Sequence, residues 1–179
     1  EIKKIARASQ VVAKVLQALK EKVKPGVTTK ELDLFSEKKI LQEGCKSAFR
    51  GYRNFPATLC VSINDEVVHG IPSEKRVIQE GDVVGLDLGV IYDGFYGDAA
   101  LTVPVGEVPK KTLRLLEVTE AALYAGIRQA KVGGRVTDIS HAIQVYAEAE
   151  GYSLVTEFVG HGIGRALHED PQVPNFGPP

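Results

Sequence analysis

Two aspartates, Asp87 and Asp98, lie on either side of an Asp93-Gly94 dipeptide in a segment that is otherwise mostly apolar. Asp-Gly between apolar runs is typical of a β-hairpin with a two-residue type I′ turn. That turn would place Asp87 opposite Ala100, with Asp98 as its diagonal neighbour on the same face. Because diagonal positions lie about 7–8 Å apart, both carboxylates can reach one metal ion.

Asp87 is the residue of the hairpin that most favours a chemical role. A buried carboxylate requires a cation, a set of hydrogen-bond donors or a metal ion. The hairpin alone leaves a metal site and a structural ion pair open, whereas turn chemistry by itself explains Asp93. Asp87 interrupts a run of residues that otherwise belongs in a core: Val83, Val84, Leu86, Leu88, Val90 and Ile91.

Three histidines are further candidates, and one of them, His161, is a possible metal ligand. His161 lies among three glycines and is followed by His168. An imidazole at a strand end suits a divalent transition metal, and glycine permits close backbone approach. The alternative is a glycine-rich turn with an incidental histidine, which requires His168 to be incidental as well. We also expect His69 at the end of a strand, where a histidine is more often a structural hydrogen-bonding group than a catalytic one.

The elements before the hairpin are predicted to be two helices and a pair of strands. Apolar residues at steps of three and four predict an amphipathic helix over residues 2–23, and its basic opposite face is interpreted as a solvated surface. Thr28 and Glu31 match a capping box that begins a second helix, which Gly44 ends. Strands on both sides of an Asn64-Asp65 turn would follow.

A second half repeats this order. Helices are expected after Pro109 and again up to Gly151, with a break at Gly133-Gly134. Shifting the chain by 107 residues superimposes Gly26 on Gly133 and Gly44 on Gly151. A duplicated α/β half is the simplest account of this repeat.

Composition excludes several classes of function. The chain has 22 basic and 23 acidic residues and a net charge of −1, so it offers no basic field for nucleic acid or an anionic membrane. Cys45 and Cys60 form no Cys-x-x-Cys pair, and neither a signal peptide nor a membrane-spanning apolar run is found. We therefore expect a cytoplasmic protein.

Three motifs together resemble the type I methionine aminopeptidases of the pita-bread metallopeptidase family. They are residues 67–72, Asp87 with residues 93–98, and residues 160–172 with their two histidines. The resemblance covers essentially the whole chain. It implies an α/β (α+β) fold with pseudo-two-fold symmetry, in which helices pack on a curved antiparallel sheet. We expect one catalytic domain over residues 1–179, with a first half at about 1–107 and an incomplete second half at about 108–179.

The resemblance also implies the site residues. Asp87, Asp98 and His161 would be metal ligands for two divalent ions (Co, Mn, Fe or Zn), and two further glutamate ligands of the family fall beyond Pro179. A metal-activated water would hydrolyse the first peptide bond. His168 would stabilise the carbonyl oxygen and His69 would contact the amide nitrogen. The substrate's methionine side chain would meet an apolar pocket, whose matching positions are Tyr52, Phe55, Cys60 and Leu167, with Phe49 as a further candidate.

The implied activity is removal of the initiator methionine from new polypeptides with a small second residue. The partners would be nascent peptide N-termini and possibly the ribosome, with no direct nucleic-acid or membrane partner, and the protein would be a monomer. One rival is a related peptidase that acts on proline bonds, against which residues 69–72 argue. The other is a non-catalytic binding module of the same fold, against which the retained ligands Asp87, Asp98 and His161 argue.

Overall fold

Two helices open the chain in the computed structural model, which describes residues 1–179. Helix α1 spans Ile2–Lys20 and α2 spans Thr29–Gln42. The predicted capping box is confirmed, because the Glu31 N–H donates to the Thr28 hydroxyl at 3.1 Å and the Thr28 N–H donates to the Glu31 carboxylate at 2.7 Å. The first helix is shorter than predicted and ends three residues before Val23.

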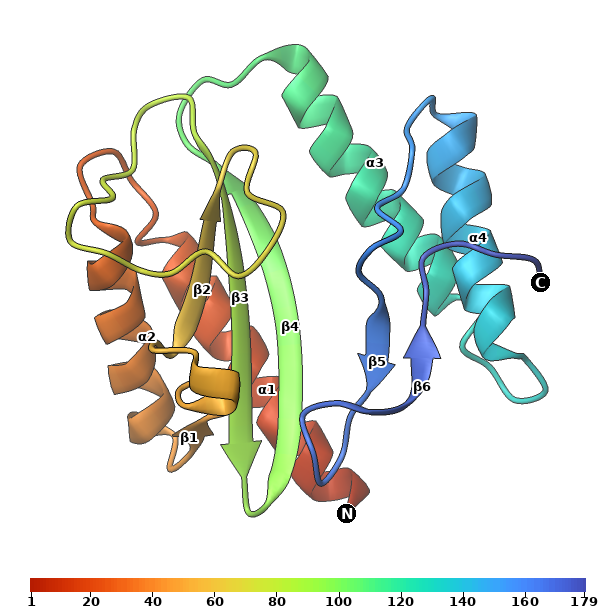
Figure 1. Ribbon diagram of the computed structural model, residues 1–179, viewed down its shortest axis with the longest axis horizontal. Helices are drawn as coiled ribbons and strands as arrows, with labels where there is room; N and C mark the ends of the chain where they lie inside the picture. The colour runs from red at the N-terminus through yellow and green to blue at the C-terminus, as the bar shows by residue number, and fades with distance from the viewer. The chain divides into compact units, whose positions relative to one another are not determined.

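A four-stranded antiparallel sheet follows (Figure 1). Its strands are β1 (Lys46–Ser47), β2 (Leu59–Ile63), β3 (Val83–Tyr92) and β4 (Phe95–Pro104), and a short 3-10 helix spans Tyr52–Asn54. Strand β3 lies in the middle of the sheet, because β1 and β2 pair with one of its edges and β4 with the other.

The β3–β4 hairpin has the predicted register. Tyr92 pairs with Phe95 across the turn, and Asp87 pairs with Ala100. The turn residue Asp93 has φ +47° and Gly94 has φ +78°, as a type I′ turn requires. The local sequence was therefore sufficient to place the two carboxylates on one face.

The two faces of β3 serve different purposes. Val84, Leu86, Leu88 and Val90 are fully buried against α1 and α2, and Figure 1 shows both helices on this side of the sheet. The residues between them, among them Asp87, point to the opposite face because side chains alternate along a strand. The apolar run that Asp87 interrupts is thus the helix-covered face of one strand.

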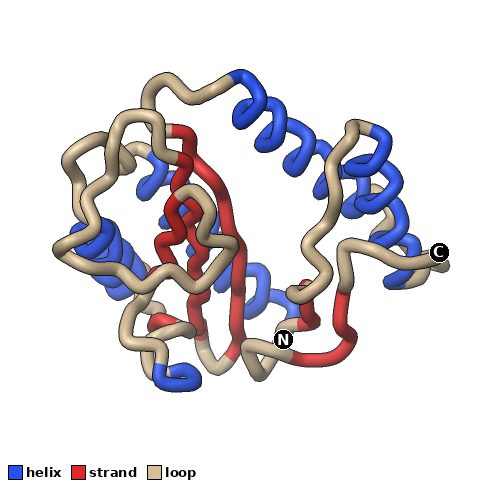
Figure 2. The backbone as a smooth tube through the Cα atoms, turned by 45° about the horizontal axis from the view of Figure 1, so that its top comes forward, coloured by secondary structure: helices blue, strands red, loops and turns tan.

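The chain divides into two compact units. The first comprises Glu1–Val108 with Ile163–Leu167, and the second comprises Pro109–Gly162 with His168–Pro179. The second unit contains α3 (Lys110–Ile127), α4 (Val136–Ala149), β5 (Gly160–Gly162) and β6 (Glu169–Val173). Strands β5 and β6 are antiparallel, and their register shifts between His161 and Gly162. Figure 2 shows the helices in blue, the strands in red and the connecting loops in tan.

The predicted repeat is confirmed by the helix bounds. A shift of 107 residues carries α2, Thr29–Gln42, onto α4, Val136–Ala149. The exits from these helices match as well, since the Cys45 N–H donates to the Ile40 carbonyl at 3.1 Å and the Tyr152 N–H donates to the Ala147 carbonyl at 3.0 Å. The division into halves of a single catalytic domain remains a prediction. None of the helices combines the length and apolarity needed to cross a bilayer.

One prediction of secondary structure is wrong. His69 does not lie at a strand end, because residues 64–82 form a loop and the predicted second strand after the Asn64-Asp65 turn is absent. His69 has a positive φ of 62°, and Val67, two residues before it, is 61% exposed. The apolar residues of this segment resemble a buried strand in sequence, yet they lie at the surface.

Candidate active site

Asp87 and Asp98 form a carboxylate pair on the sheet face turned away from the helices. Burial raises the pKa of Asp87 to about 7, and the charge of Asp98 and a hydrogen bond between the two side chains act in the same direction. Burial and mutual repulsion therefore favour a protonated carboxyl in this pair. A cation could replace that proton, so the pair has the electrostatics of a binding site for positive charge.

Apolar side chains adjoin this pair on the same face. Cys60 of β2 pairs directly with Asp87, and Gly89 pairs directly with Asp98. A Cβ atom at Gly89 would lie 2.5 Å from the ring of Phe49, so glycine is required for that ring to pack against the strand. Burial, together with the charges of Asp87 and Asp98, raises the pKa of the Cys60 thiol to about 12.

Phe49, Cys60 and Leu167 belong to one buried cluster, which also contains Ala48. The sequence-predicted pocket residues Tyr52 and Phe55 pack against it, and the Phe49 and Phe55 rings meet edge to face with centroids 6.4 Å apart. The structure therefore brings together all five residues proposed as pocket walls. Four residues in or against this cluster were not predicted: Ala48, Ile91, Tyr96 and Ile163.

Tyr96 was missed although the sequence contains a signal for it. It lies two residues before Asp98 on β4, and residues two apart on a strand share a face. Its N–H donates to the Gly164 carbonyl at 2.9 Å, and Arg165 stacks over Phe95 with its guanidinium carbon 4.8 Å from the ring centroid. These contacts attach residues 163–167, and with them Leu167, to the first unit.

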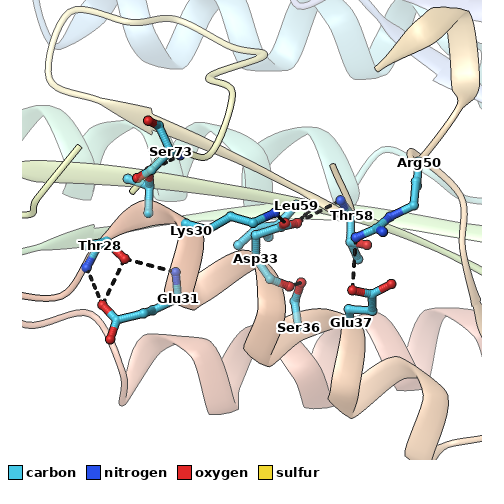
Figure 3. A network of polar contacts seen from close by, with 11 residues as sticks. Thr28, Lys30, Glu31, Asp33, Ser36, Glu37, Arg50, Thr58, Leu59 and Ser73 are labelled. Atoms are coloured by element: carbon cyan, nitrogen blue, oxygen red, sulfur yellow. Dashed lines mark hydrogen bonds and ion pairs between the residues drawn. The ribbon is translucent and has the colours of Figure 1, made fainter. Parts of the chain in front are cut away.

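The beginning of β2 is held by a buried carboxylate on α2 (Figure 3). Asp33 is fully buried, and its Oδ1 atom accepts the N–H groups of Thr58 at 2.8 Å and Leu59 at 3.2 Å. Lys30 donates to Oδ2 at 2.7 Å and compensates the charge. Because Cys60 follows directly, this network fixes the point at which the pocket-lining segment enters the sheet.

His161 and His168 lie close together in the second unit, with ring centroids 4.2 Å apart. The Nδ1 atom of His161 lies 2.9 Å from the Gly162 carbonyl oxygen. Since a carbonyl oxygen only accepts hydrogen bonds, this contact places the proton on Nδ1 and the lone pair on Nε2. Nε2 is then the atom of His161 suited to bind a metal ion.

His69 belongs to the first unit and lies in the loop that follows β2. It is exposed, in the loop after β2, and its neighbour Gly70 is hydrogen-bonded to that strand: the Val61 N–H donates to the Gly70 carbonyl at 2.9 Å. The candidate residues thus form an aspartate pair with an apolar cluster, a histidine pair, and a loop histidine. Neither unit by itself assembles three or more histidine, cysteine, aspartate or glutamate side chains into a metal-binding group.

The donor atoms in these groups fit a divalent transition metal. Carboxylate oxygens and neutral imidazole nitrogens are each donors that suit ions such as Mn²⁺, Fe²⁺, Co²⁺ and Zn²⁺. The raised pKa of Asp87 supports this fit, because a carboxyl that lacks compensating positive charge favours its protonated form.

Comparisons with known proteins define the class of protein to which this chain belongs. The model of metallopeptidase family M24 matches residues 3–179, and the chain belongs to this family. It is therefore an enzyme of a family that works with divalent metal ions.

The similar proteins narrow the class further. "Methionine aminopeptidase 1" of Bacillus subtilis is 49% identical over 172 residues, which are 96% of this chain and 69% of that protein. The crystal structure of methionine aminopeptidase from Thermotoga maritima superimposes with a TM-score of 0.98 at 41% identity, over 100% of this chain and 72% of that one. Prolidase from Pyrococcus furiosus superimposes with a TM-score of 0.86 at 25% identity, over 98% of this chain and 51% of that one. The predicted pita-bread fold is thereby confirmed.

Proposed function

We propose that this chain carries the substrate-binding face of a methionine aminopeptidase, which removes the N-terminal methionine from peptides and nascent proteins. The observation that carries the proposal is the shared face of the hairpin, where the Asp87–Asp98 pair adjoins the apolar cluster around Cys60 and Leu167. A substrate whose amino terminus meets the charged pair would have its first side chain beside that cluster. Sequence identity favours the same activity, since the chain is 49% identical to the Bacillus subtilis methionine aminopeptidase and 25% identical to the prolidase.

The metal ligands in this proposal are Asp87, Asp98 and the Nε2 atom of His161. Two bound divalent ions would acidify a water molecule and polarise the substrate carbonyl. The two aspartates would supply the negative charge that holds the ions and, through them, the free amine of the substrate. Co, Mn, Fe and Zn all suit this donor set.

The two remaining histidines would act as hydrogen-bond donors. His168 would donate to the substrate carbonyl oxygen as negative charge develops there, and His69 to the nitrogen of the scissile amide. Both are exposed, which suits groups that meet a substrate arriving from solvent. Phe49, Tyr52, Phe55, Cys60 and Leu167 would enclose the methionine side chain, whose flexible thioether packs well against aromatic edges.

The cellular compartment, oligomeric state and partners follow from the same assignment. The enzyme would act in the cytoplasm as a monomer on nascent polypeptide N-termini, with the ribosome as a candidate partner and a small second residue required of the substrate.

Cleavage of paired peptides tests the proposal. The protein at its natural length, loaded with Mn²⁺, should release methionine from a Met-Ala peptide and leave an Ala-Pro peptide intact. Preferential turnover of the Ala-Pro peptide would favour the proline-specific alternative. If Asp98→Ala bound Mn²⁺ as tightly as the parent protein, the metal assignment would be wrong and a non-catalytic binding module would be favoured.

A further inference from the structure

The segment around His69, residues 67–71, buries little apolar surface. Val67 is 61% exposed and Ile71 is 53% exposed, although both are large hydrophobic residues. A segment with few buried apolar contacts opens easily unless hydrogen bonds hold it. Hydrogen bonds must therefore fix the conformation of this loop, and they are found on both of its sides.

One guanidinium contacts both sides of the loop. Arg76 Nη1 donates to the carbonyl oxygen of Ile71 at 3.2 Å, on the side of the loop that follows His69. It also donates to the carbonyl oxygen of Val61 in β2 at 3.3 Å. Its Nη2 atom forms an ion pair with Glu66, on the side of the loop that precedes His69. Residues 67–70, with His69 among them, are the part of the loop between these ties.

The side of the loop that precedes His69 is in turn connected to the sheet. The Glu66 carboxylate accepts the N–H of Ile63, the last residue of β2, at 2.8 Å. Arg76 and Glu66 thus form a bridge from two points of β2 to both sides of the loop. A planar guanidinium with several fixed donors suits such a bridge, and an ammonium group does not reproduce it.

The backbone at His69 also requires external support. Its φ of 62° is a conformation that side-chain-bearing residues adopt at a cost. The next residue packs directly on β2, because a Cβ atom at Gly70 would lie 2.1 Å from the Val61 carbonyl oxygen, and the Gly70 N–H donates to the Ser62 hydroxyl at 3.1 Å. The imidazole of His69 is therefore presented from a strained backbone that neighbouring hydrogen bonds hold in place.

We propose that Arg76 is a positioning residue for His69: by tying Glu66, Ile71 and Val61 together, its guanidinium fixes the loop that presents the imidazole to the substrate. The inference rests on the proposed role of His69 in the reaction. Arg76 itself touches no reacting atom in this proposal, and its effect on the rate passes entirely through the loop.

A double-mutant experiment with the Mn²⁺-loaded protein at its natural length tests this inference. Because small misplacement of a catalytic group can cost on the order of 100-fold, we expect Arg76→Met to lower kcat/KM for a Met-Ala peptide by about that factor. The same substitution in the His69→Ala protein should leave the remaining rate nearly unchanged. Arg76→Lys, which keeps the charge without the planar fork, should lie between parent and Arg76→Met.

A structural readout accompanies the kinetics. The Val61 amide donates to the Gly70 carbonyl, so its hydrogen exchange, measured by NMR, should accelerate in Arg76→Met when the loop loosens. The matched control is Arg7→Met, which removes an arginine–glutamate pair at 2.9 Å between α1 and Glu43 and alters no contact of the loop. This control should change neither the rate nor the Val61 exchange.

Three results would contradict the inference, and they differ from one another. Equal losses from Arg76→Met in the parent and His69→Ala backgrounds would show that Arg76 acts independently of His69. Unchanged Val61 exchange in Arg76→Met would show that the loop is held by other contacts. A wild-type rate for His69→Ala would refute the proposed role of His69, and with it the reason for positioning it, while leaving the methionine aminopeptidase assignment to the peptide comparison above.

Discussion

Asp98 lies diagonal to Asp87 across the β3–β4 hairpin, because Asp98 pairs with Gly89 and Asp87 pairs with Ala100. The two-residue turn at Asp93-Gly94 sets this register. A slip of one residue in either strand would send one carboxylate to the face covered by helices. The carboxylate pair thus depends on the turn as much as on the aspartates themselves.

Asp87→Asn should stabilise the metal-free protein above neutral pH. The folded-state pKa of Asp87 is about 7 and the ordinary value is 3.8, so ionisation of this carboxyl opposes folding. Its cost is absent below about pH 4, grows as pH rises and is complete above about pH 7. Thermal melts with a chelator between pH 5 and 8 should show a higher melting temperature for Asp87→Asn at pH 8 and a flatter pH dependence.

The same variant should lose stabilisation by metal, since a ligand that binds only the folded state raises its stability. Added Mn²⁺ should raise the melting temperature of the parent protein more than that of Asp87→Asn. Asp65→Asn, at an exposed loop aspartate, is the control and should behave as the parent protein does. A lower melting temperature for Asp87→Asn at pH 8 in chelator would contradict the prediction.

Both cysteines should be unreactive in the folded protein. Burial raises the pKa of the Cys45 thiol, and burial with the charges of Asp87 and Asp98 raises that of Cys60 to about 12. Because the thiolate is the reactive form, iodoacetamide at pH 8 should label neither residue without denaturant and both in urea. Rapid labelling of Cys60 in the native protein would mean that the apolar cluster opens readily.

Gly97→Ala should destabilise the first unit by about 1–3 kcal/mol, the usual cost of overpacking a tight contact. A Cβ atom there would lie 2.6 Å from the Ser9 backbone nitrogen, so α1 could not keep its close approach to β4. Urea unfolding measures the change. Gly94→Asn is the matched control in the same hairpin, because nothing lies within 4 Å of that position and asparagine tolerates its φ of +78°. Equal losses in the two variants would refute the close-contact explanation.

Glu43→Gln should flatten the acid side of the stability profile. Hydrogen bonds from Lys14 and then from Arg7 hold the pKa of Glu43 below its usual 4.5. The contribution of Glu43 is therefore present above about pH 4.5 and is lost as pH falls through the lower, folded-state value. Thermal melts between pH 3 and 6 should show a smaller acid loss for Glu43→Gln than for the parent protein. Glu21→Gln, at an exposed glutamate, should keep the parental profile.

Sequence reasoning succeeded where the determining interactions are local. The hairpin register follows from two adjacent turn residues, and the start of α2 follows from Thr28 and Glu31, which are three residues apart. The helix repeat was found because Gly44 and Gly151 both adopt the positive φ that ends a helix. In each case, the signal and the structure it specifies lie within a few residues of each other.

The missed features depend on contacts distant in sequence. Val67 and Val68 resemble a strand, but only the surrounding loop shows that they are exposed. Asp33 binds the backbone of Thr58 and Leu59, which lie 25 and 26 residues away, and no pattern in the sequence points to that pairing. The bridge made by Arg76 belongs to the same category, because an arginine in a polar loop is usually a solvated residue.

The attachment of residues Ile163–Leu167 to the first unit has a consequence for dissecting the protein. The chain passes from one unit to the other at Val108, returns at Ile163 and leaves again after Leu167, so neither unit is a continuous stretch of polypeptide. A gene fragment that ends at Val108 would encode every strand of the first sheet but would lack Leu167, and the cluster around Phe49 and Cys60 would then have one side open.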